Sequence, residues 1–559
     1  MKLTPFLALS FLVLFFGISC KKGGKTGLLV PKDAAVVIHI NTASLTSKLS
    51  WEEISQTDWF KEMSNQANDS TAQRLLKDPG HSGIDTKSDL VFFMKRQGRG
   101  GYLVFEGSVK DAATFEAFNK EINKGAATSK EGGINYMPLE RSGMLAWNNS
   151  KFAYVADSPL PDMQKAFEGN RNFEMYKFPV DSLKKFGKDA LNLESSDNLD
   201  NDSRFASMIK DGSDMHLWLN VSGIYGNSLG GMVSMMKFNL LLEDNISATS
   251  LNFDDGKITM KAKGYYSKEM SKLLADYPAK PISVDVLNRI PSQNVIGVAA
   301  MNFPPDGLKE FLKVTGFDGM ANGFLGRMGY SVDEFIKSNK GEVLLAVTDL
   351  EIKAKEKTMD MGEGQEPYKY STKAPDMKVL LATAVNDKAA FDKLIGIVLE
   401  QTKGISSPNK PEIHYKLDNN WFAASNSADH MNKFLSGEST KNAVAEKISG
   451  HPVGFYVDIQ KIIKSTESSV TDSTGKTAMT ASLNMWEDII ATGGEYKDKA
   501  LHFQMEVNLV DKNTNSLKQL NQYINNMYKI NQEKKNRYKD SMTDDIRLDT
   551  VSDAPAVRP

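Results

Sequence analysis

The sequence predicts an α+β fold with two duplicated halves, in which mainly antiparallel sheets are covered by short helices. Three observations support this: strand-containing segments recur in the same order, strand-like runs come as hairpins, and short amphipathic stretches separate them. Hairpins build antiparallel sheets, and helices cover the apolar face of such a sheet. Of the 559 residues, 41% are hydrophobic and 25% are charged, which suffices for packed cores.

The duplication rests on segments that resemble each other in the two parts of the chain. The stretch VPKDAAVVIHIN resembles IPSQNVIGVAAMN, and YLVFEGSVKDAATFEAF resembles KVLLATAVNDKAAFDKL. Such internal similarity is typical of a chain built from repeated structural units. We therefore predict two α+β repeat halves, at residues 28–280 and 281–530.

Each half ends in a stretch that alternates apolar and polar residues around a short turn. Residues 246–266 turn at Asp254–Gly256, and residues 489–510 turn at Lys497–Lys499. Short polar turns between alternating runs are typical of β-hairpins. A longer hairpin insertion, rich in charge, Gly and Pro, is predicted at residues 355–374.

The strand-like runs end in an Asn or Asp where a helical stretch comes next. Such a side chain accepts hydrogen bonds from the first free N–H groups of a helix, so these positions are predicted N-caps. Pro304 and Pro305 suit the start of one of these helices. The predicted caps are Asn41, Asp111, Asn220, Asn302, Asp387 and Asp458.

Two polar segments are expected to lie outside the packed core. Residues 192–204, NLESSDNLDNDSR, are typical of a linker or exposed loop. The three aspartates of this segment lack the alternating ligands and the glycine of a calcium-binding loop. Residues 531–559 are polar with little periodicity, and we expect a disordered tail there.

The N-terminus has the features of a lipoprotein signal. An apolar run from Pro5 to Ile18 comes after Lys2 and is too short to span a membrane comfortably. The single cysteine, Cys20, comes directly after it in GISC, which predicts a signal peptide at residues 1–19 and lipidation of Cys20. The alternative is a signal peptide that happens to contain a cysteine. Residues 20–27 are rich in Lys and Gly and form the expected flexible, lipidated tether.

Charge distribution bears on location and partners. The formal net charge of -2 is spread along the chain, which excludes the basic face of a nucleic-acid-binding protein. Lys21 and Lys22 come after Cys20, where some surface-displayed lipoproteins carry an acidic export signal. We therefore expect anchoring in a cell-envelope membrane, the outer membrane in preference to the inner, with the protein facing the periplasm.

The sequence indicates no metal or cofactor site. The seven histidines show none of the spacings of a zinc site, and no glycine-rich loop has the pattern of a phosphate-binding motif. His39 lies on an alternating strand, and its counterparts in the repeats are Trp218, Tyr456 and an alanine. A position that accepts such different groups favours packing over chemistry.

One short motif matches a catalytic pattern. Residues 226–230, GNSLG, fit the G-x-S-x-G of serine hydrolases and make Ser228 a candidate nucleophile. That motif needs a strand that ends at its first glycine, whereas the predicted strand His216–Val221 ends earlier and Asn220 caps the next helical stretch. A glycine-rich connection is the favoured interpretation, and a serine hydrolase is the alternative function.

Methionines recur at helical spacing in two segments next to glycines. Because methionine is flexible and polarizable, such surfaces can bind varied apolar partners. Ordinary core filling is the favoured alternative for both segments. The candidate ligand-binding residues are Met232, Met235 and Met236 in the first segment and Met320, Phe324 and Met328 in the second.

A family resemblance adds to these predictions. The lipobox with VPKDAAVVIHIN and SLTSKLSWEEI after it resembles a domain-of-unknown-function family of Gram-negative envelope lipoproteins. The resemblance implies a secreted lipoprotein and supplies no activity, substrate or catalytic residue. We therefore expect a non-enzymatic envelope protein that binds a partner protein or an apolar ligand; a purely structural component is a further possibility.

Overall fold

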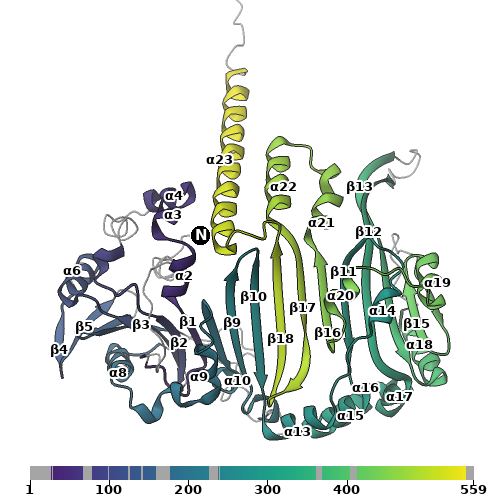
Figure 1. The fold of residues 1–559 in the computed structure, drawn as a ribbon, viewed down its shortest axis with the longest axis horizontal. Helices are drawn as coiled ribbons and strands as arrows, with labels where there is room; N and C mark the ends of the chain where they lie inside the picture. Colours follow the sequence, from purple (N-terminus) through teal and green to yellow (C-terminus); the bar gives the residue numbers. More distant parts are fainter. Residues whose placement is uncertain are drawn as a thin grey trace, which may run out of the picture.

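The structure, a computed structural model, confirms the predicted α+β class. It describes residues 27, 29–66, 79–98, 100–123, 126–139, 143–158, 177–225, 237, 239–359, 368–402 and 412–548. The eighteen strands of this part of the chain form one sheet, with helices on its faces and at both ends of its strands (Figure 1).

The sheet runs from β4 at one edge to β14 at the other, and every pair of neighbouring strands is antiparallel. The order is β4-β5-β6-β7-β3-β2-β1-β8-β9-β10-β18-β17-β16-β11-β12-β13-β15-β14. The strand bounds are β1 Val36–Ile40, β2 Leu90–Gln97, β3 Gly100–Ser108, β4 Ser129–Glu131, β5 Ile134–Leu139, β6 Gly143–Trp147, β7 Lys151–Asp157, β8 Met215–Asn220, β9 Ile246–Asp254, β10 Lys257–Tyr265, β11 Val295–Asn302, β12 Asn339–Met359, β13 Tyr368–Val385, β14 His414–Leu417, β15 Trp421–Ser425, β16 Val453–Asp458, β17 Trp486–Lys497 and β18 Ala500–Leu509.

Most helices connect strands that are neighbours in the sheet. The helix bounds are α2 Thr42–Lys48, α3 Trp51–Ser55, α4 Asp58–Gln66, α6 Ala112–Ile122, α8 Val180–Leu191, α9 Ser203–Ile209, α10 Val221–Tyr225, α12 Asn239–Leu242, α13 Lys268–Asp276, α14 Val284–Asn288, α15 Pro305–Thr315, α16 Asp318–Arg327, α17 Val332–Ser338, α18 Lys388–Thr402, α19 Ala428–Ser436, α20 Val444–Ile448, α21 Ile459–Thr466, α22 Ser473–Met485 and α23 Ser516–Leu548. The 3-10 helices are η1 Pro79–Ser82, η2 Ser195–Asp197, η3 Leu199–Asn201 and η4 Glu467–Ser469.

The two predicted halves have matching strand orders. The run β3-β2-β1-β8-β9-β10 in the first half corresponds to β13-β12-β11-β16-β17-β18 in the second, and the halves meet where β10 pairs with β18. Backbone contacts also correspond, since Asn41 N–H donates to Asp214 O and Asn302 N–H donates to Pro452 O. Strand order alone does not establish a duplication, so the duplication stays a prediction.

The first half buries apolar side chains on both faces of the sheet. On one face, Trp218 of β8 is fully buried with Phe186 of α8 and Phe205 of α9. On the opposite face, Ile40 of β1 is buried with Leu45 of α2 and other side chains of α2, α3, α4 and α6. We call this second surface the covered face. Helices therefore enclose the first half from both sides.

The second half has a single buried core. Ala300 and Leu344 of the sheet are buried with Phe434 of α19 and Ile448 of α20. Directly opposite residues in a sheet share a face. Paired residues lead across the sheet from His216 to Ala300, which places this core on the same face as Trp218.

Five of the six predicted N-caps are confirmed. The side chains of Asn41, Asp111, Asn220, Asp387 and Asp458 each accept a hydrogen bond from a backbone N–H at the start of the next helix. The prediction for Asn302 is wrong, because α15 begins only at Pro305 and has no side-chain cap. A residue before proline avoids helical geometry, so the two prolines displace the helix start from the end of the strand.

Two polar segments differ from expectation. Residues 192–204 are not a free linker, since Leu199 is buried in the first-half core and its N–H donates to Val30 O at 2.8 Å. The tail does not begin at residue 531, because α23 continues to Leu548 (Figure 1). This helix contains no Gly or Pro, so its backbone can stay helical beyond the packed part.

Helix α23 connects the two halves. Its Asn525 side chain accepts a hydrogen bond from Asp58 N–H of α4 at 2.8 Å, and Asn521 accepts one from Trp59 Nε1 at 3.2 Å. On its other side, Tyr523 packs edge-on against Trp486 of β17. The last helix of the second half therefore completes the packing of the first half.

Candidate functional site

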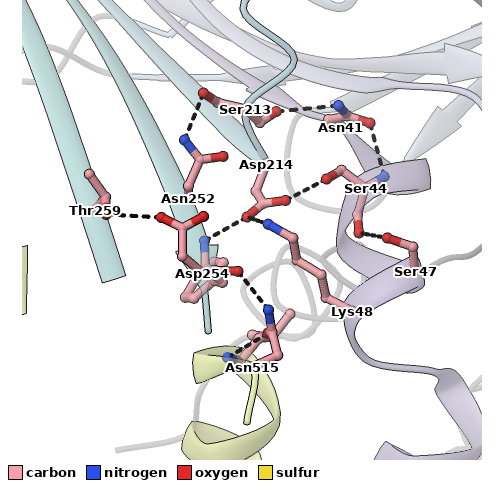
Figure 2. Close-up of polar contacts among 12 residues, drawn as sticks. Asn41, Ser44, Ser47, Lys48, Ser213, Asp214, Asn252, Asp254, Thr259 and Asn515 are labelled. Atoms are coloured by element: carbon pink, nitrogen blue, oxygen red, sulfur yellow. Dashed lines mark hydrogen bonds and ion pairs between the residues drawn. The ribbon is translucent and has the colours of Figure 1, made fainter. Parts of the chain in front are cut away.

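A buried carboxylate, Asp214, lies directly before β8 and holds α2 to the sheet (Figure 2). Its side chain accepts hydrogen bonds from Lys48 Nζ and Ser44 Oγ of α2, both at 2.6 Å. It also accepts one from Phe253 N–H of β9 at 2.6 Å. A buried carboxylate without a partner costs several kcal/mol, so the ion pair and the hydrogen bonds together compensate its burial.

Further polar contacts extend this cluster to the start of α23 (Figure 2). Asn252 Nδ2 donates to Ser213 Oγ at 2.9 Å, and Asn515 Nδ2 donates to Phe253 O at 2.8 Å. These contacts join the α2 region, β9 and the α23 region. The arrangement is that of a structural clamp, because the polar atoms of the cluster bind one another.

Two buried histidines form a second polar group, on the other face of β1 and β8. His39 and His216 lie directly opposite each other, and their Nδ1 atoms are 3.0 Å apart. His216 Nε2 is 2.8 Å from Asp211 Oδ1. His39 Nε2 is 3.1 Å from Asp89 Oδ2, an ion-pair distance without the alignment of a hydrogen bond. Sequence reasoning missed this pair, because 177 residues separate its members.

The contacts of the histidine pair define where its protons lie. His216 must donate from Nε2 to Asp211, so when neutral its Nδ1 accepts the proton of His39 Nδ1. Burial disfavours the charge on Asp211, but hydrogen bonds from His216, Ser250 and Ser213 outweigh burial and hold its pKa well below the usual range.

The histidine pair does not have the order of a nucleophilic triad. In such a triad, a histidine lies between the serine and the acid. Here Ser250 Oγ donates directly to Asp211 Oδ2 at 2.6 Å, so the acid lies between serine and histidine. The two histidines, Asp211 and Ser250 therefore form a buried network of hydrogen bonds.

The N-terminal segment enters the fold beside another buried acid. Leu29 N–H donates to Glu106 Oε1 at 2.9 Å, and Lys151 Nζ donates to Gly27 O. Burial raises the pKa of Glu106 to about 7, because the Leu29 hydrogen bond and the charge of Lys151 offset only part of the desolvation. Leu29 therefore enters the fold beside a carboxyl whose pKa lies near neutral pH.

An apolar surface continues from the covered face into the second half. Starting at Ile40, directly paired residues share one face across the whole sheet. In strand order they are Met215, Leu251, Met260, Met505, Ala491, Phe455, Ala299, Leu345, Leu381 and Ala424.

Two more rows flank this row on the seven strands from β10 to β13. One contains Ala262, Phe503, Gly493, Val453, Met301, Val343 and Thr383. The other contains Ile258, Val507, Ile489, Val457, Gly297, Val347 and Val379. We call these two rows, with Met260, Met505, Ala491, Phe455, Ala299, Leu345 and Leu381, the open face. It contains no charged residue, and Thr383 supplies its single side-chain hydroxyl.

The open face is exposed although it is apolar. Met301 is 44% exposed, and Leu345, Leu381, Phe455 and Phe503 are each 42% exposed. Contiguous apolar surfaces of this kind mark sites of interaction.

On β10 and β18, the surface opposite the open face is polar. The apolar character of the open face is therefore specific to one side of these strands. On β10 and β18, Lys261 lies opposite Gln504, and Lys257 forms an ion pair with Glu506. An antiparallel sheet that alternates in this way has one solvated face and one face that packs against something apolar. Among the described helices, α13, α15, α16 and α17 lie along one end of the strands, while α21, α22 and α23 lie at the other end (Figure 1), where α21 also contacts β11, β12 and β17.

Three predicted ligand-binding residues lie on or next to α16. Met320 and Phe324 are 55% and 59% exposed, and Met328 is half-buried. No side chain of α16 is buried, so core filling is wrong for Met320 and Phe324, and ligand binding stays a prediction. Cys20, Ser228, Met232, Met235 and Met236 lie outside the described residues.

The described residues contain neither a metal cluster nor a membrane-spanning helix. Within them, no group of three or more His, Cys, Asp or Glu side chains is arranged to hold a metal ion. No helix in this part of the chain has both the length and the apolar character needed to cross a membrane.

The described residues form a large α+β protein whose sheet exposes an apolar face. The chain belongs to a family described as Domain of unknown function (DUF4836), whose model matches residues 27–356. The predicted membership of a domain-of-unknown-function family is thereby confirmed. The matched segment covers the first half and continues into β12.

Similarity to other known proteins is weak. No curated protein matches the chain. The solved structures of crystal forms IV and III of TP0453 are each 12% identical, with TM-scores of 0.21. Both cover 47% of this chain, and the chain covers 91% and 90% of them, respectively.

Proposed function

We propose that this protein is a non-enzymatic binding protein of the cell envelope, which carries an apolar ligand or partner on its open face. The observation that carries the proposal is the exposure of Met301, Leu345, Leu381, Phe455 and Phe503 on one uncharged surface. The same layer of the first half is filled by helix side chains. An occupant of the open face would complete that layer in the second half.

The size of the open face is compatible with useful affinity. Strands are about 4.8 Å apart and residues on one face recur about every 6.8 Å, so seven strands and three rows cover about 700 Å². Burying that much apolar surface contributes on the order of 15 kcal/mol before the cost of association.

The anchoring part of the proposal rests on the sequence. A lipid on Cys20 would hold the protein at the envelope membrane, facing the periplasm, through residues 20–27. Matching strand orders in the two halves support the proposed duplication. Cys20→Ala should move the protein from the membrane fraction to the soluble fraction; unchanged fractionation would contradict the anchor.

The binding part is tested with two neighbouring residues of β18 that point to opposite faces. Phe503→Glu places a charge on the open face, whereas Gln504→Glu places the same charge on the polar face beside Lys261. We expect an environment-sensitive apolar fluorescent probe to bind the wild-type and Gln504→Glu proteins and to bind Phe503→Glu at least tenfold more weakly. Equal binding by all three proteins would overturn the proposal.

A further inference from the structure

We propose that the occupant of the open face is the acyl-chain part of a membrane phospholipid. This inference rests on the proposed function and names the chemical class of the ligand. Two properties of the open face carry it: its lack of polar groups and its continuity with the covered face.

The chemistry of the open face selects an occupant that needs no hydrogen bonds. Thr383 supplies its single side-chain hydroxyl, and the backbone groups of these inner strands are paired within the sheet. Protein–protein interfaces have about one hydrogen bond per 100–200 Å². Their most important residues are Trp, Tyr and Arg, and the open face contains none of these. Hydrocarbon chains match an uncharged surface without donors or acceptors.

The covered face shows which chemical groups pack against this side of the sheet, because the open face continues it. In the first half, the layer next to the sheet consists of aliphatic and aromatic side chains, including Leu45 of α2 and Leu49, which follows this helix. The open face lies on the same side of the same sheet. Met260, Met301 and Met505 are flexible side chains that can adapt to a chain of variable shape. For a protein held at a membrane, phospholipid is the most abundant source of acyl chains.

The experiment uses the full chain with Cys20→Ala, so that any lipid detected is bound without a covalent bond. The protein is incubated with vesicles of phosphatidylethanolamine and phosphatidylglycerol, isolated again, and analysed by native mass spectrometry. We expect about one phospholipid per chain, the same amount with Gln504→Glu, and at least a tenfold loss with Phe503→Glu. Leu345→Glu on β12 serves as a second variant if Phe503→Glu does not fold, which its thermal unfolding curve will show.

The outcomes separate this inference from the proposed function. If Phe503→Glu loses the apolar probe but no protein carries phospholipid, the face is a binding surface and the phospholipid inference is overturned. The phospholipid inference is also overturned if free fatty acid alone is recovered. It is overturned equally if the wild-type protein forms a dimer that Phe503→Glu dissociates. If neither probe nor phospholipid depends on Phe503 and Leu345, both proposals fail.

Discussion

One face of a single sheet is closed in the first half of this protein and exposed in the second. In the first half, Ile40 is 2% exposed and is buried with Leu45 of α2 and with Leu49, which follows this helix. In the second half, Leu345 and Phe455, in the same row of paired residues, are 42% exposed. The sheet is equally apolar in both places. The difference therefore lies in the helices and not in the strands.

The connection after the first strand of each half explains the difference. After β1, α2 starts at Thr42, with Asn41 as its cap, and its Leu45 side chain is buried on the sheet. After β11, Pro304 and Pro305 delay the helix start, and no apolar side chain of α15 is buried. Helix α15 packs instead against α13, α16 and α17 at the end of the strands. Two prolines thus accompany the change from a covering helix to a peripheral one.

The largest expected effect comes from breaking the clamp that holds α2 on the covered face. Asp214→Ala leaves the Lys48 ammonium without its buried partner and should lower the free energy of unfolding by about 4 kcal/mol. Denaturant unfolding measures this effect. Asp333→Ala, which removes an exposed ion pair with Lys309, is the control and should cost no more than about 0.5 kcal/mol. Equal losses in the two variants would refute the role of the clamp.

A second comparison tests the two parts of the face directly. Leu49→Ala removes a buried side chain from the covered face and should lower the free energy of unfolding by about 3 kcal/mol. Leu345→Ala removes a side chain that is already 42% exposed and should cost less than about 1 kcal/mol without ligand. If Leu345→Ala is as damaging as Leu49→Ala, the open face is buried in solution.

A third prediction concerns a buried acid that is present in the first half. The pKa of Glu106 is raised from 4.5 to about 7 in the folded protein, so folding is favoured when this carboxyl is protonated. The contribution of the protonated carboxyl to the free energy of unfolding is fully present below pH 4.5 and is lost as the pH rises through 7. Glu106→Gln should therefore stabilise the protein by about 2 kcal/mol at pH 8 and by much less at pH 5. Thermal unfolding across this pH range checks the sign, and a gain that is independent of pH would contradict it.

The smallest effect tests the two helix starts. Asn41→Ala should cost about 1 kcal/mol, because the side chain caps α2 by accepting a hydrogen bond from Ser44 N–H. Asn302→Ala should cost only a few tenths of a kcal/mol, since Asn302 caps no helix. Both values come from denaturant unfolding, and similar costs would show that α15 depends on Asn302 after all.

The sequence predicted local features well, because those depend on neighbouring residues. Alternation identified the hairpins around Gly256 and Asp498, and the capping side chains are confirmed except where Pro304 and Pro305 intervene. No local pattern showed that the open face is uncovered, because cover is supplied by helices distant in the sequence.

The sites that sequence reasoning missed depend on contacts between distant segments. The interaction of His39 with His216 requires the pairing of β1 with β8, which no local pattern encodes. Similarly, the methionine spacing around Met320 predicted an apolar helix but could not distinguish a core position from an exposed one. Both the histidine contact and the exposure of Met320 depend on how distant segments pack against one another.

The position of α23 has a consequence for the order in which the protein can be made. Leu517 of α23 is part of the buried core of the covered face, and Asn525 binds Asp58, which precedes it by 467 residues. A chain that is synthesised from its N-terminus exposes the first half long before α23 exists. The covered face therefore stays incomplete until nearly the whole chain has emerged, and truncation near residue 515 should expose apolar surface in the half that was made first.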